Sequence, residues 1–65
     1  MLEKIPTDKN GKPLKFCQIV AVDSGLFESP IWGRVMNPGM EKSIIALEGG
    51  EINVFDNSKI EIKID

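Results

Sequence analysis

Hydrophobic and polar positions alternate most clearly in the stretch SIIALEGGEINV, where Gly49-Gly50 divides two apolar runs. A two-residue loop at this dipeptide would pair Leu47 with Ile52 and Ile45 with Val54 across antiparallel strands. We expect these four side chains on one buried face, because a one-residue slip would turn one strand's apolar set to water. The pattern therefore predicts a β-hairpin and its register.

Further apolar stretches, rich in β-branched residues and bounded by turn residues, predict the other strands. We expect strands at Phe16–Val22, Ile31–Met36, Ser43–Glu48, Glu51–Asp56 and Ile60–Ile64. The connector DNSK before the last strand is typical of a polar turn or of one turn of 3₁₀ helix. No stretch has the length and period of an ordinary helix, so the pattern indicates an all-β chain.

Two details of these elements follow from single residues. Gln18 interrupts the apolar run of the first strand, so we expect its side chain to point outward. The side chains expected to point inward are then Cys17, Ile19 and Ala21. The turn NPGM after the second strand suits a type II turn, which needs a positive φ at Gly39.

The beginning of the chain differs in composition from the rest. Residues 1–15 are polar and are broken by two prolines and an Asn-Gly pair, which favour turns and disfavour a central strand. We expect an irregular N-terminal arm, mobile or lying along a sheet edge, which Leu2 and Ile5 can anchor. Residues 16–65 then form the folded domain, with its longest internal loop at residues 23–30.

Five short strands in about 50 residues must bury a common apolar face and protect their edges, which favours a small barrel. The order of elements resembles the SH3-like barrels: a first strand CQIVAV, a longer loop DSGLFESP, two hairpins, the connector DNSK and a last strand IEIKI. The resemblance covers about residues 16–65 and implies a single five-stranded SH3-like barrel behind an irregular arm. Peptide-binding members carry tyrosines and paired tryptophans, whereas this chain has no tyrosine and only Trp32. The alternative fold is an oligonucleotide-binding barrel.

Length and composition limit the setting of the protein. A chain of 65 residues is one domain of marginal stability, and its hydrophobic share of 42% is that of a folded chain. The single cysteine, Cys17, cannot form an intramolecular disulfide, and we interpret it as a small buried hydrophobe in a reducing, cytoplasmic setting. No apolar run approaches the roughly 20 residues of a membrane span, so we expect no membrane contact.

Charge is distributed unevenly along the chain. Residues 1–15 contain four lysines and two acidic residues, a net charge of +2, while the rest contains four basic and eight acidic residues, a net charge of −4. Nucleic-acid binding depends on many Lys and Arg contacts to phosphate, which an acidic body with one arginine does not supply. The lysines of the arm fit a solubilising role better, although they leave nucleic acid as an alternative partner.

The composition offers little to catalysis or to metal binding. The chain has no histidine, so neither a Ser-His-Asp nor a Cys-His arrangement can be built within it. One cysteine cannot provide the four ligands of a zinc site. The carboxylates of Glu48 and Glu51 flank the Gly-Gly turn and fit solvated turn charges. We therefore expect a protein that is not an enzyme and that uses no metal and no cofactor.

One surface carries more apolar side chains than a solvated face should. In the predicted register Ile44 lies across from Phe55 on the side of the hairpin away from the core. If a bulge accompanies the NPGM turn, Trp32, Arg34 and Met36 join them there. Trp, Arg, Met and Phe are enriched at protein interfaces, so these five residues are the predicted partner-binding surface.

Three readings of this surface remain open at this point: a second small core under the arm or the 23–30 loop, an interface with a partner protein or a second copy, or a small-molecule site. We expect a small binding or regulatory protein that docks onto another macromolecule. Chains of this size are common among bacterial and phage accessory proteins that modulate a larger enzyme or complex. The alternatives are a nucleic-acid-associated SH3-like barrel that uses its lysine-rich arm, and a structural subunit of a larger complex.

Overall fold

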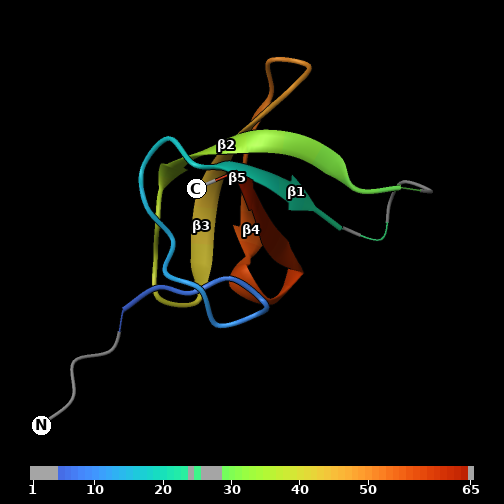
Figure 1. The fold of residues 1–65 in the computed structure, drawn as a ribbon. Helices are drawn as coiled ribbons and strands as arrows, with labels where there is room; N and C mark the ends of the chain where they lie inside the picture. Colours follow the sequence, from blue (N-terminus) through green and yellow to red (C-terminus); the bar gives the residue numbers. More distant parts are fainter. Residues whose placement is uncertain (1–4, 24, 26–28, 65) are drawn as a thin grey trace, which may run out of the picture.

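The computed structural model describes residues 5–23, 25 and 29–64. Within these residues the chain forms five strands and one short 3₁₀ helix (Figure 1). The elements are β1 Ile19–Val22, β2 Ile31–Asn37, β3 Lys42–Leu47, β4 Ile52–Asp56, η1 Asn57–Lys59 and β5 Ile60–Ile64. The all-β class and all five strands predicted from the sequence are confirmed, and the 3₁₀ turn lies in the expected connector.

The strands make one antiparallel sheet in the order β4-β3-β2-β1-β5. In Figure 1, β1 and β2 cross over β3 and β4, so the sheet is curved. β4 and β5 do not pair with each other within the described residues, and the sheet is therefore not closed into a barrel. No helix in the part of the chain that the structure describes is long and apolar enough to cross a membrane.

One face of the curved sheet surrounds the core. Its buried side chains occupy alternate positions along the strands, as expected when successive residues of a strand point to opposite faces. They are Val20, Val22, Val35, Ile45, Ile60 and Ile62, joined by Leu14 from the arm and by the partly buried Leu47 and Phe55. The strand residues at the positions between them, among them Ile19, Arg34, Ala46 and Ile52, point to the opposite side, which we call the outer face.

The register of the β3–β4 hairpin differs from the prediction by one residue. Ile44 pairs with Val54 and Ala46 pairs with Ile52, whereas Ile45 lies opposite Asn53. The slip leaves Ile45 buried and turns Ile52 and Val54 to the outer face, where both are exposed. The prediction that four apolar side chains share one buried face is wrong.

The loop of this hairpin explains the slip. The N–H of Leu47 donates to the carbonyl oxygen of Glu51 at 2.6 Å, so three residues, not two, lie between the last bonded pair. Gly50 has a φ of +97°, the left-handed conformation that ends a three-residue hairpin loop. The dipeptide Gly49-Gly50 therefore belongs to a three-residue loop. The additional loop residue shifts the pairing of β4 against β3 by one residue.

The β2–β3 connection has the predicted bulge but a different turn. The register shifts between Val35 and Asn37, which makes Met36 the additional residue. Gly39 does not have the positive φ of a type II turn, so that prediction is wrong. Glycine is needed there for space, because a Cβ atom would collide with the carbonyl oxygen of Lys42.

The first strand is shorter than predicted because a turn precedes it. Cys17 has a φ of +73° and lies exposed in this turn, so it is not the buried hydrophobe that the sequence suggested. Gln18 is buried, not exposed: its Oε1 accepts from the N–H of Lys15 at 2.7 Å and its Nε2 donates to the carbonyl of Pro13 at 3.1 Å. The inward residues of β1 are Val20 and Val22, the opposite set from the predicted one.

The described part of the arm lies along β5, the edge placement that the sequence allowed. A carboxylate oxygen of Asp8, Oδ2, accepts from the N–H of Ile62, while Oδ1 accepts from the N–H groups of Asn10 and Lys12, each at 2.9 Å. Burial raises the pKa of this carboxyl, but the three N–H donors and the charge of Lys12 outweigh it and hold the pKa below its ordinary value.

The anchor of the arm in the core is Leu14, which is buried. Ile5, one of the two predicted anchors, is 53% exposed. Leu2, the other, lies outside the described residues, as do residue 24 and residues 26–28 of the 23–30 loop.

Candidate functional site

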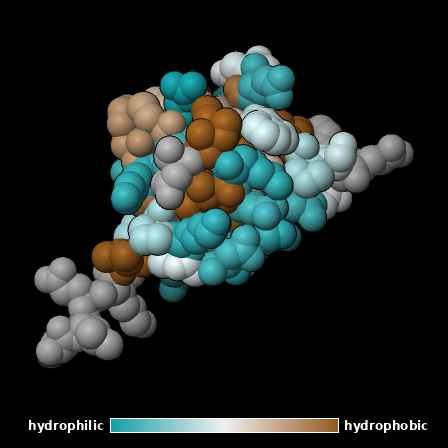
Figure 2. Space-filling view, in the orientation of Figure 1, coloured by the Kyte–Doolittle hydropathy of each residue, from teal (hydrophilic) through white to brown (hydrophobic). Residues whose placement is uncertain are grey.

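The outer face of the sheet has apolar side chains on all of its strands. Because paired residues of an antiparallel sheet point to the same side, the strand pairings place these side chains in rows. One row crosses five strands and consists of Ile64, Ile19, Arg34, Ala46 and Ile52. Figure 2 shows that hydrophobic side chains also lie at the surface of the molecule, among hydrophilic ones. The core therefore does not use all of the apolar side chains.

Two apolar residues of β4 on this face are largely exposed. Ile52 is 61% exposed and Val54 is 58% exposed, and both are β-branched residues on β4, an edge strand of the sheet. Ile44 lies between Asn37 and Val54 in the next row and is half-buried. An apolar surface of this kind on a small protein is typical of an interaction site.

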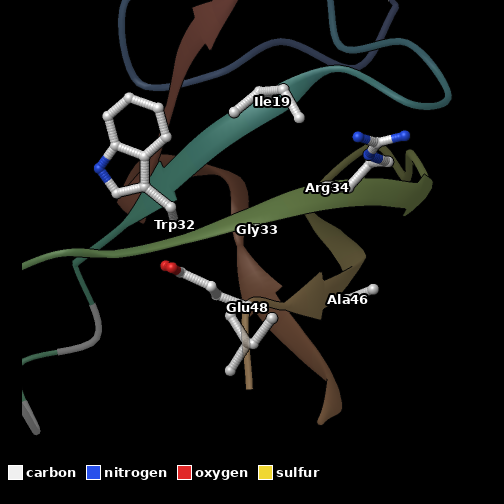
Figure 3. A pocket seen from close by; sticks show the side chains of 7 residues that line it. Ile19, Trp32, Gly33, Arg34, Ala46 and Glu48 are labelled. Carbon is white, nitrogen blue, oxygen red and sulfur yellow. The ribbon is translucent and has the colours of Figure 1, made fainter. Parts of the chain in front are cut away.

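Next to these residues the outer face is hollowed into an open groove of about 680 Å³. The groove is lined by Ile19, Trp32, Gly33, Arg34, Ala46, Leu47 and Glu48. Figure 3 shows Trp32 and Arg34 on β2 with Gly33 between them, Ile19 on β1 at one side, and Ala46 and Glu48 at the other. Three neighbouring segments of the chain thus contribute to one hollow.

Gly33 lets β2 approach β3 closely beneath the groove. A Cβ atom at this position would lie 2.7 Å from the carbonyl oxygen of Ala46 and 2.8 Å from a methyl carbon of Ile45. Neither distance is compatible with a side chain, and glycine within a strand commonly marks such a close approach. Gly33 pairs with Val20 and Leu47 and so lies on the core side of β2, where the absence of a side chain lets the two strands pack closely.

Two opposite charges lie beside the apolar floor of the groove. The guanidinium group of Arg34 is exposed, and no ion pair within the described residues joins it to a carboxylate. The N–H of Glu48 donates to the carbonyl oxygen of Trp32 at 3.0 Å, which places the backbone of Glu48 beside that of Trp32 (Figure 3). Both charged groups can therefore pair with a partner without first breaking an ion pair with each other.

Of the five residues predicted for the partner-binding surface, the structure places Trp32, Arg34 and Ile44 on the outer face. Trp32 and Arg34 line the groove, Ile44 lies on the outer face two residues from Ala46, and Met36 is exposed at the bulge. Phe55 is elsewhere: it pairs with the buried Ser43 and packs against the core. The predicted opposition of Ile44 and Phe55 is wrong, because Val54 takes that place.

Sequence reasoning did not find the residues of β4 and β1 that belong to this face. The sequence pattern predicts Ile52 and Val54 in the core and Ile19 pointing inward, whereas the structure places all three on the outer face. The available signal was the apolar character of both faces of the β3–β4 hairpin, which made more than one register possible.

Metal-binding clusters, unsatisfied polar groups and further hollows among the described residues are the other features that could mark a site. No group of three or more Cys, Asp or Glu side chains in this part of the chain is placed to hold a metal ion. No buried side-chain nitrogen or oxygen of the described residues lacks a hydrogen-bond partner. A second hollow of about 200 Å³ lies at the base of the β3–β4 loop, beside Leu47 and Gly49. The groove and the exposed residues of β4 are therefore the best candidate site.

Comparisons of the chain with protein-family models, with curated proteins and with solved structures find no match.

Proposed function

We propose that this protein is a small, non-enzymatic binding protein that docks its outer face onto another protein and regulates it. The observation that carries the proposal is the apolar row through Ala46 and Ile52, which borders a groove lined by Trp32. Exposed aromatic and β-branched side chains around a hollow can bury a partner's apolar side chain, and such anchors dominate the binding energy of protein interfaces.

The proposal specifies the partner by its chemistry. The groove has an apolar floor with a cation, Arg34, and an anion, Glu48, on its lining. A matching partner inserts an apolar side chain and carries an acidic group near Arg34 and a basic group near Glu48. Such charges fix the orientation of the partner more than they add affinity.

The finer fold assignment is part of this proposal. We assign the chain to the SH3-like barrels, because a first strand is followed by two hairpins, a single 3₁₀ turn and a last strand that pairs with the first. The proposal also includes a reducing, cytoplasmic setting, supported by the single cysteine, and a role like that of bacterial or phage accessory proteins that modulate a larger enzyme.

The test compares two variants that remove exposed apolar side chains from different places. Proteins retained on the immobilised wild-type chain are identified, and their affinities for each variant are measured. Trp32→Ala combined with Ile52→Ser should abolish binding of the partner, whereas Ile5→Ser should leave it unchanged. Ile5 is a matched control because its 53% exposure is close to that of Ile52 and it lies on the arm. Circular dichroism establishes that each variant is folded.

The alternative partner, nucleic acid, predicts a different pattern. Lys12 and Lys15 are exposed on the arm, while the ammonium group of Lys9 lies 4.0 Å from the carboxylate of Glu61. If the partner is nucleic acid, Lys12→Glu and Lys15→Glu should weaken binding strongly and raised salt should release it. If the outer face binds a protein, these charge reversals should have little effect.

A further inference from the structure

The two edges of the sheet differ in how they are covered. On the outer side of β5, the N–H of Lys9 donates to the carbonyl oxygen of Ile60 at 2.9 Å, and the carboxylate of Asp8 accepts from the N–H of Ile62. The arm therefore closes this edge. On the outer side of β4, no hydrogen bond from the described residues reaches the backbone, and β4 is the open edge.

The hydrogen bonds at both ends of β4 establish which backbone groups face outward. The N–H of Leu47 donates to the carbonyl of Glu51, and the N–H of Asn57 donates to the carbonyl of Glu41 at 2.8 Å. Residues of an antiparallel strand alternate between facing one neighbour and facing the other. The odd-numbered residues from 51 to 57 therefore face β3. The N–H and C=O groups that face outward belong to Ile52, Val54 and Asp56.

β4 lacks three of the usual features that prevent an edge from pairing with another strand, and its one charged residue, Asp56, is at its end. Proteins commonly place lysine, proline or a bulge on such strands. The strand INVFD contains no lysine and no proline, and its register against β3 has no shift. Its outward-facing residues Ile52 and Val54 also expose β-branched side chains, which favour the extended conformation.

We propose that β4 pairs in antiparallel orientation with β4 of a second copy of this chain, around a two-fold axis at Val54. In this register Val54 lies opposite Val54 of the second copy, and Ile52 lies opposite Asp56. All three residues present N–H and C=O groups outward, so every one of these groups meets a partner. The isologous arrangement needs no complementary sequence other than that of β4 itself.

Two features make a second copy a better occupant than an unrelated strand. First, Phe55 lies half-buried at the edge, and the two-fold axis places Asn53 of the second copy opposite it, which covers the ring. Second, the arm covers the β5 edge at Ile60 and Ile62, which disfavours addition of a further copy there, so we expect the assembly to end at two copies. The outer faces of the two copies then form one continuous surface.

The expected dimer is weak. An interface made by one five-residue strand is smaller than the roughly 1,200 Å² at the lower end of stable, specific interfaces. We therefore expect a mass of 7.2 kDa in dilute solution and of about twice that at millimolar concentration, measured by sedimentation equilibrium.

Two substitutions of Val54 distinguish the contribution of its backbone N–H to dimer formation from that of its side chain. Val54→Pro removes the outward N–H without removing a bond to β3, a position where edge strands accept proline. Val54→Thr keeps the N–H and the branched shape. Val54→Pro should remain monomeric at all concentrations, and Val54→Thr should dimerise as the wild type does. A dimer that persists in Val54→Pro, or assemblies larger than two copies, would overturn the proposal.

Amide hydrogen exchange in the wild type tests whether β4 pairs between two copies, even if Val54→Pro does not fold. The N–H groups of Ile52, Val54 and Asp56 should exchange rapidly in dilute solution and slowly at high concentration. The N–H groups of Asn53 and Phe55, which bond to β3, should be protected at both. Rapid exchange of the first three at every concentration would contradict pairing through β4. This outcome would leave the proposed docking of the outer face untouched, because that proposal is tested at Trp32 and Ile52.

Discussion

The hydroxyl group of Ser43 donates a hydrogen bond of 2.6 Å to Oδ1 of Asn57, and both side chains are buried. Asn57 also donates through Nδ2 to the carbonyl oxygens of Gly39 and Met40, at 2.7 and 3.1 Å. The N–H of Gly39 in turn donates to the oxygen of Ser43 at 3.1 Å. This network joins the β2–β3 loop to η1 and leaves no polar atom of the pair unsatisfied.

Asn57→Ala should lower the free energy of unfolding by about 2–3 kcal/mol, because it leaves a buried hydroxyl and two carbonyl groups without their partner. Asn53→Ala is the matched control, since the side chain of Asn53 is exposed and donates to the carboxylate of Glu51 at the surface. Its effect should lie within about 0.5 kcal/mol. Urea denaturation of both variants measures the difference. Equal losses would show that the network contributes little.

The β3–β4 register predicts opposite outcomes for two isoleucines of one hairpin. Ile45 is fully buried, so Ile45→Ala should cost about 2–5 kcal/mol through lost burial and a cavity. Ile52 is exposed, so Ile52→Ala should change stability by no more than about 0.5 kcal/mol. If chemical denaturation found Ile52→Ala to be the more damaging change, the register with four buried side chains would be the true one.

Asp8 should make the stability of the protein depend on pH in the acid range. Since its pKa is lower in the folded chain than the ordinary 3.8, the unfolded chain takes up a proton first as the pH falls. The carboxylate therefore adds stability above the ordinary pKa. That contribution disappears as the pH falls through the lowered pKa of the folded state.

Asp8→Asn tests this contribution. At about pH 7 the variant should be less stable than the wild type by about 1–3 kcal/mol, because the amide replaces a carboxylate that accepts three N–H groups. At about pH 2 the difference should become smaller. Asp23→Asn, a change of an exposed carboxylate, is the control at neutral pH. A difference between Asp8→Asn and wild type that stayed constant with pH would refute the role of the charge.

Gly39 and Gly49 differ in the space around them: a Cβ atom has no room at Gly39 and open space at Gly49. Gly39→Ala should cost about 1–3 kcal/mol, because its Cβ collides with the carbonyl oxygen of Lys42 and the loop must move. Gly49→Ala has open space around the new Cβ and an ordinary φ, so its melting temperature should stay near that of the wild type. Equal melting temperatures for the two variants would argue against the close approach at Gly39.

Much of the fold can be predicted from local patterns. Alternation and turn residues indicate five strands and the connector before β5, because each element is specified by a few neighbouring residues. The bulge at Met36 was also predictable, since a proline turn does not match the twist of a two-residue hairpin.

The register of β3 and β4 could not be predicted in the same way. Residues on both faces of this hairpin are apolar, with Ile44 beside Ile45 on one strand and Val54 beside Phe55 on the other. A slip of one residue therefore exchanges one apolar set for another, and the hydrophobic pattern gives no preference. The loop determines the register through the positive φ of Gly50. The sequence does not reveal the loop length, because a Gly-Gly pair fits both a two-residue and a three-residue loop.

The sequence predicts only part of the candidate site, because the residues of β4 depend on the register that the pattern leaves open. Trp32 and Arg34 follow from the bulge, which depends on one turn. Ile52 and Val54 follow from the register, which the pattern leaves open. Gln18 and Cys17 were misplaced because the turn before β1 bonds the Gln18 side chain to two backbone groups, a contact that composition does not reveal.

The central claim, that the outer face docks onto another protein, is tested most directly by photo-crosslinking in cells that express the chain. A photoreactive phenylalanine derivative replaces either Trp32, in the groove, or Phe16, which is equally aromatic and 63% exposed but lies in the turn before β1. The account predicts a discrete adduct with a different protein from position 32 and none from position 16. The same adduct from both positions, or none from position 32, would contradict it.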